Sequence, residues 1–225
     1  NNLLVANKDG KYGVIDFENK IIADFNWKSI SKLNDGNYVI VQNNQNMYGI
    51  LNIINLKLTI PCIYKYIDKN ESTSGFIVQN QSGQKSIVTI NNEQILKNWY
   101  DEIYTVSNRR NLIVKKSGKY GIIDDQENII LPIEYNSIKS YPYNDGSYLA
   151  QNAEGKFGCV AIDGKITLPF EYDQLNESSG QSILVSNKKK RCGIVQVNQG
   201  LPTEILTCDY DDIQVNRQTF IISKA

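Results

Sequence analysis

The chain has 225 residues, of which 41% are hydrophobic and 21% charged, and its 24 basic and 24 acidic side chains give a net charge of zero. This length and composition favour a folded core over disorder, and the lack of a basic excess argues against nucleic-acid binding. The sequence contains no histidine, which excludes Ser-His-Asp triads, Cys-His dyads and HExxH zinc sites.

The predicted elements are short β-strands. Apolar runs rich in β-branched residues are followed by turns containing Asn, Gly or Lys, and then by a second apolar run such as 120–123. A third strand near 129–131 and a fourth near 137–141 complete this pattern. Helical periodicity is absent, and no run of about 18 apolar residues predicts a membrane span. Examples of the opening run are residues 3–6, 38–41, 76–78, 112–114, 183–185 and 220–223.

Two markers repeat with a period of about 36 residues. The first is an aromatic-glycine pair, at Tyr12-Gly13, Tyr48-Gly49, Tyr120-Gly121 and Phe157-Gly158, with weaker relatives at Cys192-Gly193 and, by register only, Lys85-Ser86. The second is an aromatic residue with an aliphatic residue three positions later. These marker aromatics are Trp27, Tyr64, Tyr100, Tyr135, Tyr172 and Tyr210. We expect their rings to pack between units and their hydroxyls to reach backbone groups.

The repeat predicts a single all-β domain over residues 1–225, built from six units. Units of four short strands suit a six-bladed β-propeller, and the alternative is an open β-repeat array or solenoid. Residues 3–6 and 220–223 both match a first strand, so the chain has seven such strands and six of every other kind. This surplus is a difficulty for a closed ring and none for an open array, but the six-bladed propeller is the arrangement that we predict. The units span residues 3–37, 38–75, 76–111, 112–147, 148–182 and 183–219, with a closing or surplus strand at 220–225.

The fourth unit carries a resemblance to a known family. Its segments Lys119–Asp124, Ile129–Pro132 and Glu134-Tyr135 resemble the WG repeat, a bacterial β-strand repeat that occurs in tandem, although Tyr or Phe stands here in place of Trp. The third unit lacks the pair, and Cys192 replaces its aromatic residue in the sixth. The resemblance implies a bacterial interaction scaffold that is often exported, hence secreted or at the cell surface, with a cytoplasmic location as the alternative. It implies no catalytic residues.

Aromatic residues outside the two markers are the candidate ligand-binding residues. Trp99 stands where the other units are mostly polar, so we expect it to be exposed, and an exposed Trp is a common binding anchor. The remaining candidates are Tyr141 and Tyr143 near a turn, with Tyr104 and Tyr66. Their alternative role is to cover the edges of neighbouring units.

A basic patch is formed by Lys188, Lys189, Lys190 and Arg191, which we place in the turn between the first two strands of the sixth unit. It could contact phosphate or an acidic partner, or be a solvated hairpin tip balanced by nearby acidic residues such as Asp211. No metal site or cofactor is predicted. Three of the four cysteines occupy apolar positions of the repeat, which indicates buried side chains.

The sequence therefore predicts a non-catalytic module that binds a protein or a glycan through non-repeated residues on a rigid frame. It is expected to be a monomer that neither spans a membrane nor binds nucleic acid. Two alternatives stay open. One is a glycan hydrolase working with a pair of carboxylates, and the other is a purely structural spacer.

Overall fold

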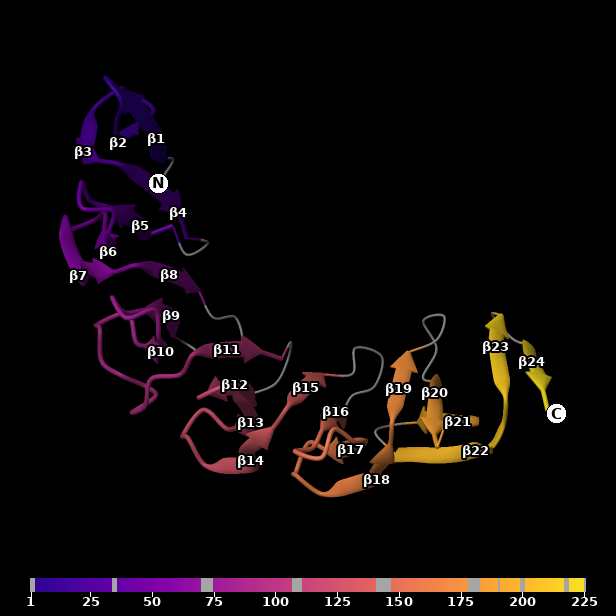
Figure 1. Cartoon of the computed structure of the whole chain (residues 1–225). Coiled ribbons are helices and arrows are strands. Elements are labelled where there is room, and N and C mark those ends of the chain that lie inside the picture. Colours follow the sequence, from indigo (N-terminus) through magenta and orange to yellow (C-terminus); the bar gives the residue numbers. More distant parts are fainter. Residues whose placement is uncertain are drawn as a thin grey trace. The chain divides into compact units, whose positions relative to one another are not determined.

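A computed structural model describes residues 3–33, 36–69, 75–106, 111–140, 147–177, 183–189, 191–198, 201–216 and 219–224. All regular structure in these residues is β-strand. The strands form small antiparallel sheets in which consecutive strands are neighbours (Figure 1). Contacts divide the chain into two compact units, Asn1–Leu112 with Asp125–Glu127, and Ile113–Asp124 with Asn128–Ala225. Each unit is described by itself.

Unit 1 begins with a three-stranded sheet, β1-β2-β3, and continues with a four-stranded sheet, β4-β5-β6-β7, and a three-stranded sheet, β10-β9-β8. The strands are β1 (Leu3–Lys8), β2 (Lys11–Asp16), β3 (Ile21–Trp27), β4 (Ser29–Lys32), β5 (Tyr38–Gln42), β6 (Tyr48–Asn52), β7 (Lys57–Tyr64), β8 (Tyr66–Lys69), β9 (Phe76–Gln79), β10 (Lys85–Val88) and β11 (Glu102–Thr105).

The next sheet has the order β11-β12-β13-β14, and the division between the units falls at β12. Unit 2 continues with β15-β16-β17-β18, β19-β20-β21-β22 and the pair β23-β24. The strands are β12 (Leu112–Lys116), β13 (Lys119–Ile123), β14 (Ile129–Tyr135), β15 (Ser137–Ser140), β16 (Ser147–Gln151), β17 (Phe157–Ala161), β18 (Ile166–Tyr172), β19 (Gln174–Glu177), β20 (Ile183–Lys188), β21 (Arg191–Asn198), β22 (Leu201–Tyr210), β23 (Asp212–Asn216) and β24 (Thr219–Ser223).

The hydrogen-bonded sheets are offset by one strand from the units read in the sequence. The short strand after each marker aromatic was predicted to complete its own unit. Instead it is the first strand of the following sheet, so that β4 pairs with β5 and β15 pairs with β16. Both surplus strands are present: β1 pairs with β2, and β24 pairs with β23. Each regular sheet therefore starts just after one marker aromatic and ends at the next.

The glycine of the aromatic-glycine pair lets the fourth strand come close to the third. The pairing register between the third and fourth strands shifts at this glycine. The shift falls between Tyr48 and Ile50 in the second sheet and between Phe157 and Cys159 in the fifth. A Cβ atom added to Gly158 would lie 2.7 Å from the carbonyl oxygen of Leu168, and one added to Gly49 would lie 2.6 Å from that of Ile60. A side chain at this position is thus incompatible with the bulged fourth strand.

The third sheet shows what happens when the glycine is missing. Ser86 stands at this position, fully buried, and its hydroxyl donates a hydrogen bond to the carbonyl oxygen of Leu96 (3.2 Å). No regular fourth strand forms in the described residues 89–101. The chain there makes only isolated bridges, from Lys85 to Tyr100 and from Val88 to Gln94. The sheet that lacks the aromatic-glycine pair is thus the one without a regular fourth strand.

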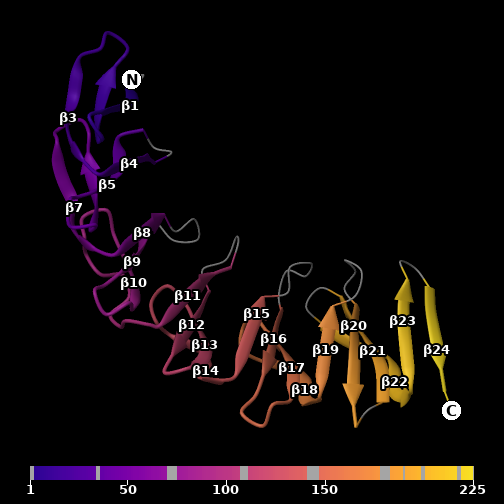
Figure 2. The ribbon, with the colours of Figure 1, turned by 45° about the horizontal axis from the view of Figure 1, so that its top comes forward.

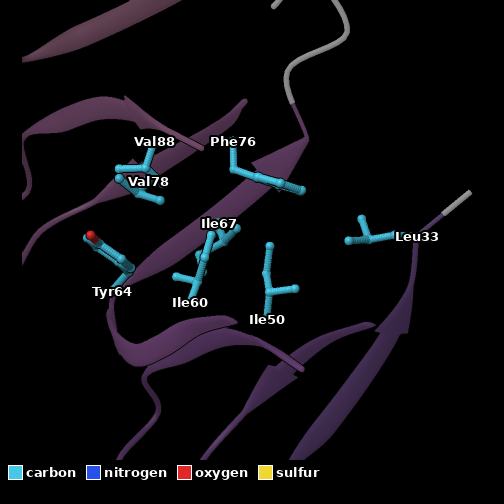
Figure 3. Packing of buried hydrophobic residues seen from close by; sticks show 8 residues of the cluster. All are labelled: Leu33, Ile50, Ile60, Tyr64, Ile67, Phe76, Val78 and Val88. Carbon is cyan, nitrogen blue, oxygen red and sulfur yellow. The ribbon is translucent and has the colours of Figure 1, made fainter. Parts of the chain in front are cut away.

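The cores lie between successive sheets. In unit 1 one cluster joins Ile50, Ile60 and Tyr64 of the second sheet to side chains of the third (Figure 3). In unit 2 Leu149, Cys159, Leu168 and Tyr172 pack in the same way against Leu175 and Val195 of the next sheet. Each sheet is therefore stabilised by its neighbour, as in other repeat proteins. The third-sheet members of the cluster in Figure 3 are Ile67, Phe76, Val78 and Val88.

The predicted fold class, an all-β tandem repeat, is confirmed by these sheets. The six-bladed propeller and the open array differ in how the two units sit relative to one another, and the choice between them stays a prediction. None of the described residues belongs to a helix that is long and apolar enough to cross a membrane.

Candidate binding groove

The marker aromatics are structural residues. Tyr64, Tyr100, Tyr135 and Tyr172 are buried. The hydroxyl of Tyr64 donates to Asn92 Oδ1 (2.7 Å), and that of Tyr100 donates to Glu127 Oε1 (2.9 Å). The rings pack as predicted, but these two hydroxyls reach side chains and not the backbone groups that were expected.

The two acceptors occupy equivalent places in successive sheets. Asn92 and Glu127 are the residues with left-handed backbone, at φ 65° and 64°, in the turn before the fourth strand or its substitute. The residue with left-handed backbone at the equivalent turn of the second sheet is Leu56, at φ 57°. In two repeats the hydroxyl of the marker tyrosine thus donates to the side chain of this turn residue.

Glu127 is the most heavily bonded of these turn residues. Its carboxylate also accepts hydrogen bonds from the backbone N–H groups of Lys97 (2.7 Å) and Asn98 (3.1 Å). Partial burial alone would raise the pKa of the Glu127 carboxyl, but the hydrogen bonds from Tyr100, Asn98 and Lys97 outweigh it and lower that pKa. The carboxylate therefore holds segment 97–100, which replaces the missing fourth strand.

In three sheets the basic residue before the aromatic-glycine position bonds the residue after the marker aromatic. Lys119 Nζ donates to Asn136 Oδ1 (2.6 Å), while Lys156 pairs with Asp173 and Arg191 with Asp211. In the irregular third sheet the pair moves by one residue, to Lys85 and Glu102. The Lys-aromatic-Gly pattern is thus explained by sheet geometry.

Trp99 was expected to be exposed, and this expectation is wrong in part. The equivalent residues Asn26, Ile63, Glu134, Glu171 and Asp209 are all exposed, but Trp99 is partly buried and packs against the core cluster of Figure 3. It lies in the segment that lacks strand structure, so the alternation of its sister strands does not apply. Its position favours the alternative role of covering a sheet edge.

Of the other aromatic residues predicted to bind a ligand, the structure describes two. Tyr66 on β8 and Tyr104 on β11 are exposed, at 45% and 47% of their surface. The Tyr66 hydroxyl donates to Asp68 Oδ2 (2.9 Å). Tyr141 and Tyr143 lie outside the described residues.

Tyr66 and Tyr104 belong to a repeated surface that we call the variable face. It consists of the two side chains that flank the buried aliphatic residue of each first strand. This central residue is always Ile or Leu and is buried except for the partly buried Ile30, whereas the flanking residues range from Ser to Lys, Gln, Asp and Tyr. The variable face comprises Ser29, Ser31, Tyr66, Asp68, Glu102, Tyr104, Ser137, Lys139, Gln174, Asn176, Asp212 and Gln214.

In unit 2 two successive parts of the variable face line a groove. It lies between the sheets that begin with β15 and β19, both labelled in Figure 2, and it has a volume of about 430 Å³. Its apolar surface comes from Phe157, Leu149 and Leu175, of which the two leucines are buried. The polar lining is formed by Ser137, Lys139, Gln151, Asp173, Gln174 and Asn176.

The carboxylate in this groove is already bonded. Asp173 pairs with Lys156 and accepts a hydrogen bond from the backbone N–H of Lys189 (2.8 Å). Hydrogen bonds from Lys156 first, and then from Lys189, hold the pKa of the Asp173 carboxyl below its ordinary value. Since a general acid needs a raised pKa near neutrality, Asp173 is poorly suited to that role.

The sequence did not single out the groove residues Ser137, Lys139, Gln174 and Asn176. Tyr66 and Tyr104 occupy the same two positions in other repeats, and were noticed because they are aromatic. The signal that was available is the contrast between one position that is always Ile or Leu and two flanking positions that differ between most repeats.

The basic patch lies where it was predicted. Lys188 pairs with Arg191 across the hairpin between β20 and β21, and Lys189 has a left-handed backbone (φ 51°) in the turn. Arg191 is paired with Asp211, as the charge-balance alternative anticipated. Lys190 lies outside the described residues.

The cysteines are free thiols. Cys159 is buried, and burial raises the pKa of its thiol to about 12. Cys62, Cys192 and Cys208 are partly buried and pack against core clusters. Among the described residues, no three acidic or cysteine side chains gather in a way that could hold a metal ion.

Comparison with protein families identifies one repeat of the chain. The WG containing repeat family matches residues 120–155, so the resemblance predicted from the fourth unit is confirmed there. The match runs from the aromatic residue of one Lys-aromatic-Gly pattern almost to that of the next. None of the curated proteins compared with the chain matches it.

Solved structures resemble the chain only distantly. A computationally designed protein, Ika8, is 11% identical, with 100% of this chain and 78% of that chain covered and a TM-score of 0.36. BamB from Moraxella catarrhalis is 12% identical, with 99% and 76% covered and a TM-score of 0.38. Hsv2 from Kluyveromyces lactis is 12% identical, with 86% and 70% covered and a TM-score of 0.39. Likenesses at these TM-scores carry no information on the arrangement of the sheets.

Proposed function

We propose that the chain is a non-catalytic binding module whose variable face recognises a protein or glycan partner. The observation that supports this proposal is that each repeat has separate structural positions and exposed positions. Markers, glycines and basic residues have identifiable structural contacts, whereas the two flanking positions of each first strand are partly or fully exposed and differ between repeats. Such variation on a constant frame is how repeat proteins present binding surfaces.

The groove in unit 2 is the proposed principal site. It combines a concave shape, an apolar base and several polar side chains, which are the common features of ligand sites. Tyr66 and Tyr104 provide a second contact surface in unit 1, because exposed tyrosines supply both an apolar ring and a hydroxyl.

The hydrolase alternative is less well supported. Hydrolysis of a glycoside by two carboxylates requires a pair about 5 to 10 Å apart, one of them with a raised pKa. Asp173 is the single carboxylate among the described residues that line the groove, and its ion pair keeps it charged. The spacer alternative leaves the exposure of Tyr66 and Tyr104 without a purpose.

The test is a screen of the purified chain against immobilised glycans and peptides, followed by affinity measurements on defined hits. We expect the double variant Gln174→Ala/Asn176→Ala to bind a groove ligand about tenfold more weakly, as for central contacts of an interface. Tyr66→Ala/Tyr104→Ala tests the surface in unit 1 in the same way.

The matched control is Glu134→Ala, an exposed residue on β14 outside the groove and outside the variable face. It should bind every hit as the wild type does. The proposal fails if no defined ligand binds, or if hits bind both double variants with unchanged affinity.

A further inference from the structure

Two charged side chains, Asp173 and Lys139, line the unit 2 groove, and they differ in their bonding to the rest of the protein. Asp173 is neutralised by Lys156 and by a backbone N–H group. Lys139, by contrast, is exposed on β15, and its ammonium group has no partner among the residues that the structure describes. The charge that remains available to a ligand is therefore positive.

The polar groups around Lys139 suit hydroxyl groups. Ser137, Gln174 and Asn176 line the groove, and their hydroxyl and amide groups can both donate and accept hydrogen bonds. Gln151 is less available, because its Nε2 atom already donates to the carbonyl oxygen of Gly155 (3.0 Å). Several donor-acceptor side chains near one cation match a ligand with several hydroxyls and one negative charge.

The apolar part of the groove is small. Leu149 and Leu175 are buried, which leaves the partly buried ring of Phe157 as the main exposed apolar surface. One ring can support the CH face of a sugar, but it does not form the deep, water-free pocket in which an apolar anchor of a protein partner binds. One lysine balances the single charge of a carboxylate, but only part of the charge of a phosphate monoester, which is about −1.5 to −2 at pH 7.

From this combination we infer that the groove binds a saccharide that carries a carboxylate, such as a uronic acid, with the carboxylate at Lys139 and the hydroxyls at Ser137 and at the linked amides of Gln174 and Asn176, which share one long hydrogen bond (3.5 Å). The inference rests on the proposed function and narrows it to one ligand class. The groove volume of about 430 Å³ lies within the usual range of small-ligand sites, roughly 300 to 1,000 Å³.

Three probes test the inference by calorimetric titration of the whole chain. They are tetragalacturonic acid, its fully methyl-esterified form, which has the same rings without charge, and an acidic hexapeptide of Asp and Ser. We expect the acid to bind about tenfold more tightly than the ester, because one charge-assisted hydrogen bond is lost with the ester. Added salt should reduce this preference, and the peptide should bind more weakly than the acid.

Two variants make the assignment specific. Lys139→Gln should abolish the preference for the acid over the ester and leave the melting temperature unchanged. Lys165→Gln removes the same charge from an exposed residue of the same sheet, outside the groove, and should retain the preference.

The outcomes separate the inference from the proposed function. Equal binding of acid and ester, weakened by Gln174→Ala/Asn176→Ala, would overturn the acidic saccharide and leave a groove that binds sugars. Tighter binding of the peptide would overturn the saccharide and favour a protein partner. If none of the three probes binds while the screen gives other groove ligands, the inference falls and the proposed function stands. If no ligand of any kind binds in the groove, both the inference and the proposed role of the groove are overturned.

Discussion

At the scale of single residues, polar side chains add specific contacts at fixed places of the repeat. Glu127 bonds a marker tyrosine and two backbone N–H groups at once, and Asn136 and Asp173 accept hydrogen bonds from the basic residue of their own sheet. These contacts explain why polar residues recur at fixed places in a chain without net charge.

The carboxylate of Glu127 predicts a dependence of stability on pH. Its pKa is lowered in the folded chain, so its contribution is present above the ordinary pKa of glutamate, about 4.3, and is lost as the pH falls through the folded value. Glu127→Gln should reduce the free energy of unfolding by about 1 kcal/mol at pH 7 and should flatten its decline in acid. Urea unfolding at several pH values measures both effects.

The control for this prediction is Glu18→Gln, which removes an exposed carboxylate from a turn of the same unit. It should follow the wild type at every pH. If Glu127→Gln and the wild type lose stability in parallel between pH 7 and pH 3, the carboxylate does not hold segment 97–100.

At the scale of elements, the aromatic-glycine pair determines whether a fourth strand can form. Where glycine is present the fourth strand bulges over it, and where Ser86 replaces it the regular strand is absent. The aromatic residue and the glycine therefore have different roles, since the first packs and the second keeps space free.

Gly158→Ala tests this role. The added Cβ would lie 2.7 Å from the carbonyl oxygen of Leu168 and about 3.0 Å from the ring of Phe170, so β18 must move away from β17. We expect a loss of about 2 kcal/mol or more, the cost of overpacking a buried site, and faster amide exchange in β18 than in β16. Hydrogen-exchange mass spectrometry resolves the strands.

Gly155→Ala in the same sheet is the matched variant. Gly155 has a positive φ of 79°, but an added Cβ would meet only Gln151 Nε2 at 3.8 Å. It should cost about 1 kcal/mol, the price of a left-handed backbone, and leave the exchange of β18 unchanged. Equal effects of both substitutions would contradict the role given to Gly158.

The strands were predictable from the sequence, but their grouping into sheets was not recognised. β3 ends at Trp27 and β4 begins at Ser29, and a hairpin needs a connection of at least two residues. The single residue Lys28 therefore already prevents β4 from pairing back onto β3. Alternation of apolar residues located the strands, but it carries no information on their partners.

The site was predictable only in part. Tyr66 and Tyr104 stood out by residue type, whereas the groove depends on side chains from 137 to 176 that meet only when two sheets pack. Trp99 was predicted to be exposed because the equivalent positions of the other repeats are mostly polar. The prediction failed because the fourth strand is lost in this sheet, and that loss is connected with Ser86 and not with any feature of position 99.

At the scale of the whole molecule, stability is expected to be local. Clusters around Ile60 belong to unit 1 and clusters around Ile194 belong to unit 2. Ile60→Ala should cost about 3 kcal/mol and should raise amide exchange in the sheets of unit 1 well above that in unit 2. Ile194→Ala should show the opposite distribution, and a uniform increase after either substitution would mean that the chain unfolds as one cooperative body.

The spacing of the ties between sheets has a consequence for chain length. A marker tyrosine finds its acceptor 28 residues later at Asn92 and 27 residues later at Glu127, always one sheet onward. Insertion of one whole period of about 36 residues would leave each marker tyrosine opposite an equivalent turn of the next sheet. Insertion of half a period would place its buried hydroxyl opposite a different part of the sheet. The number of repeats can therefore change in whole steps without redesign of any contact, and each added repeat extends the variable face by two further positions.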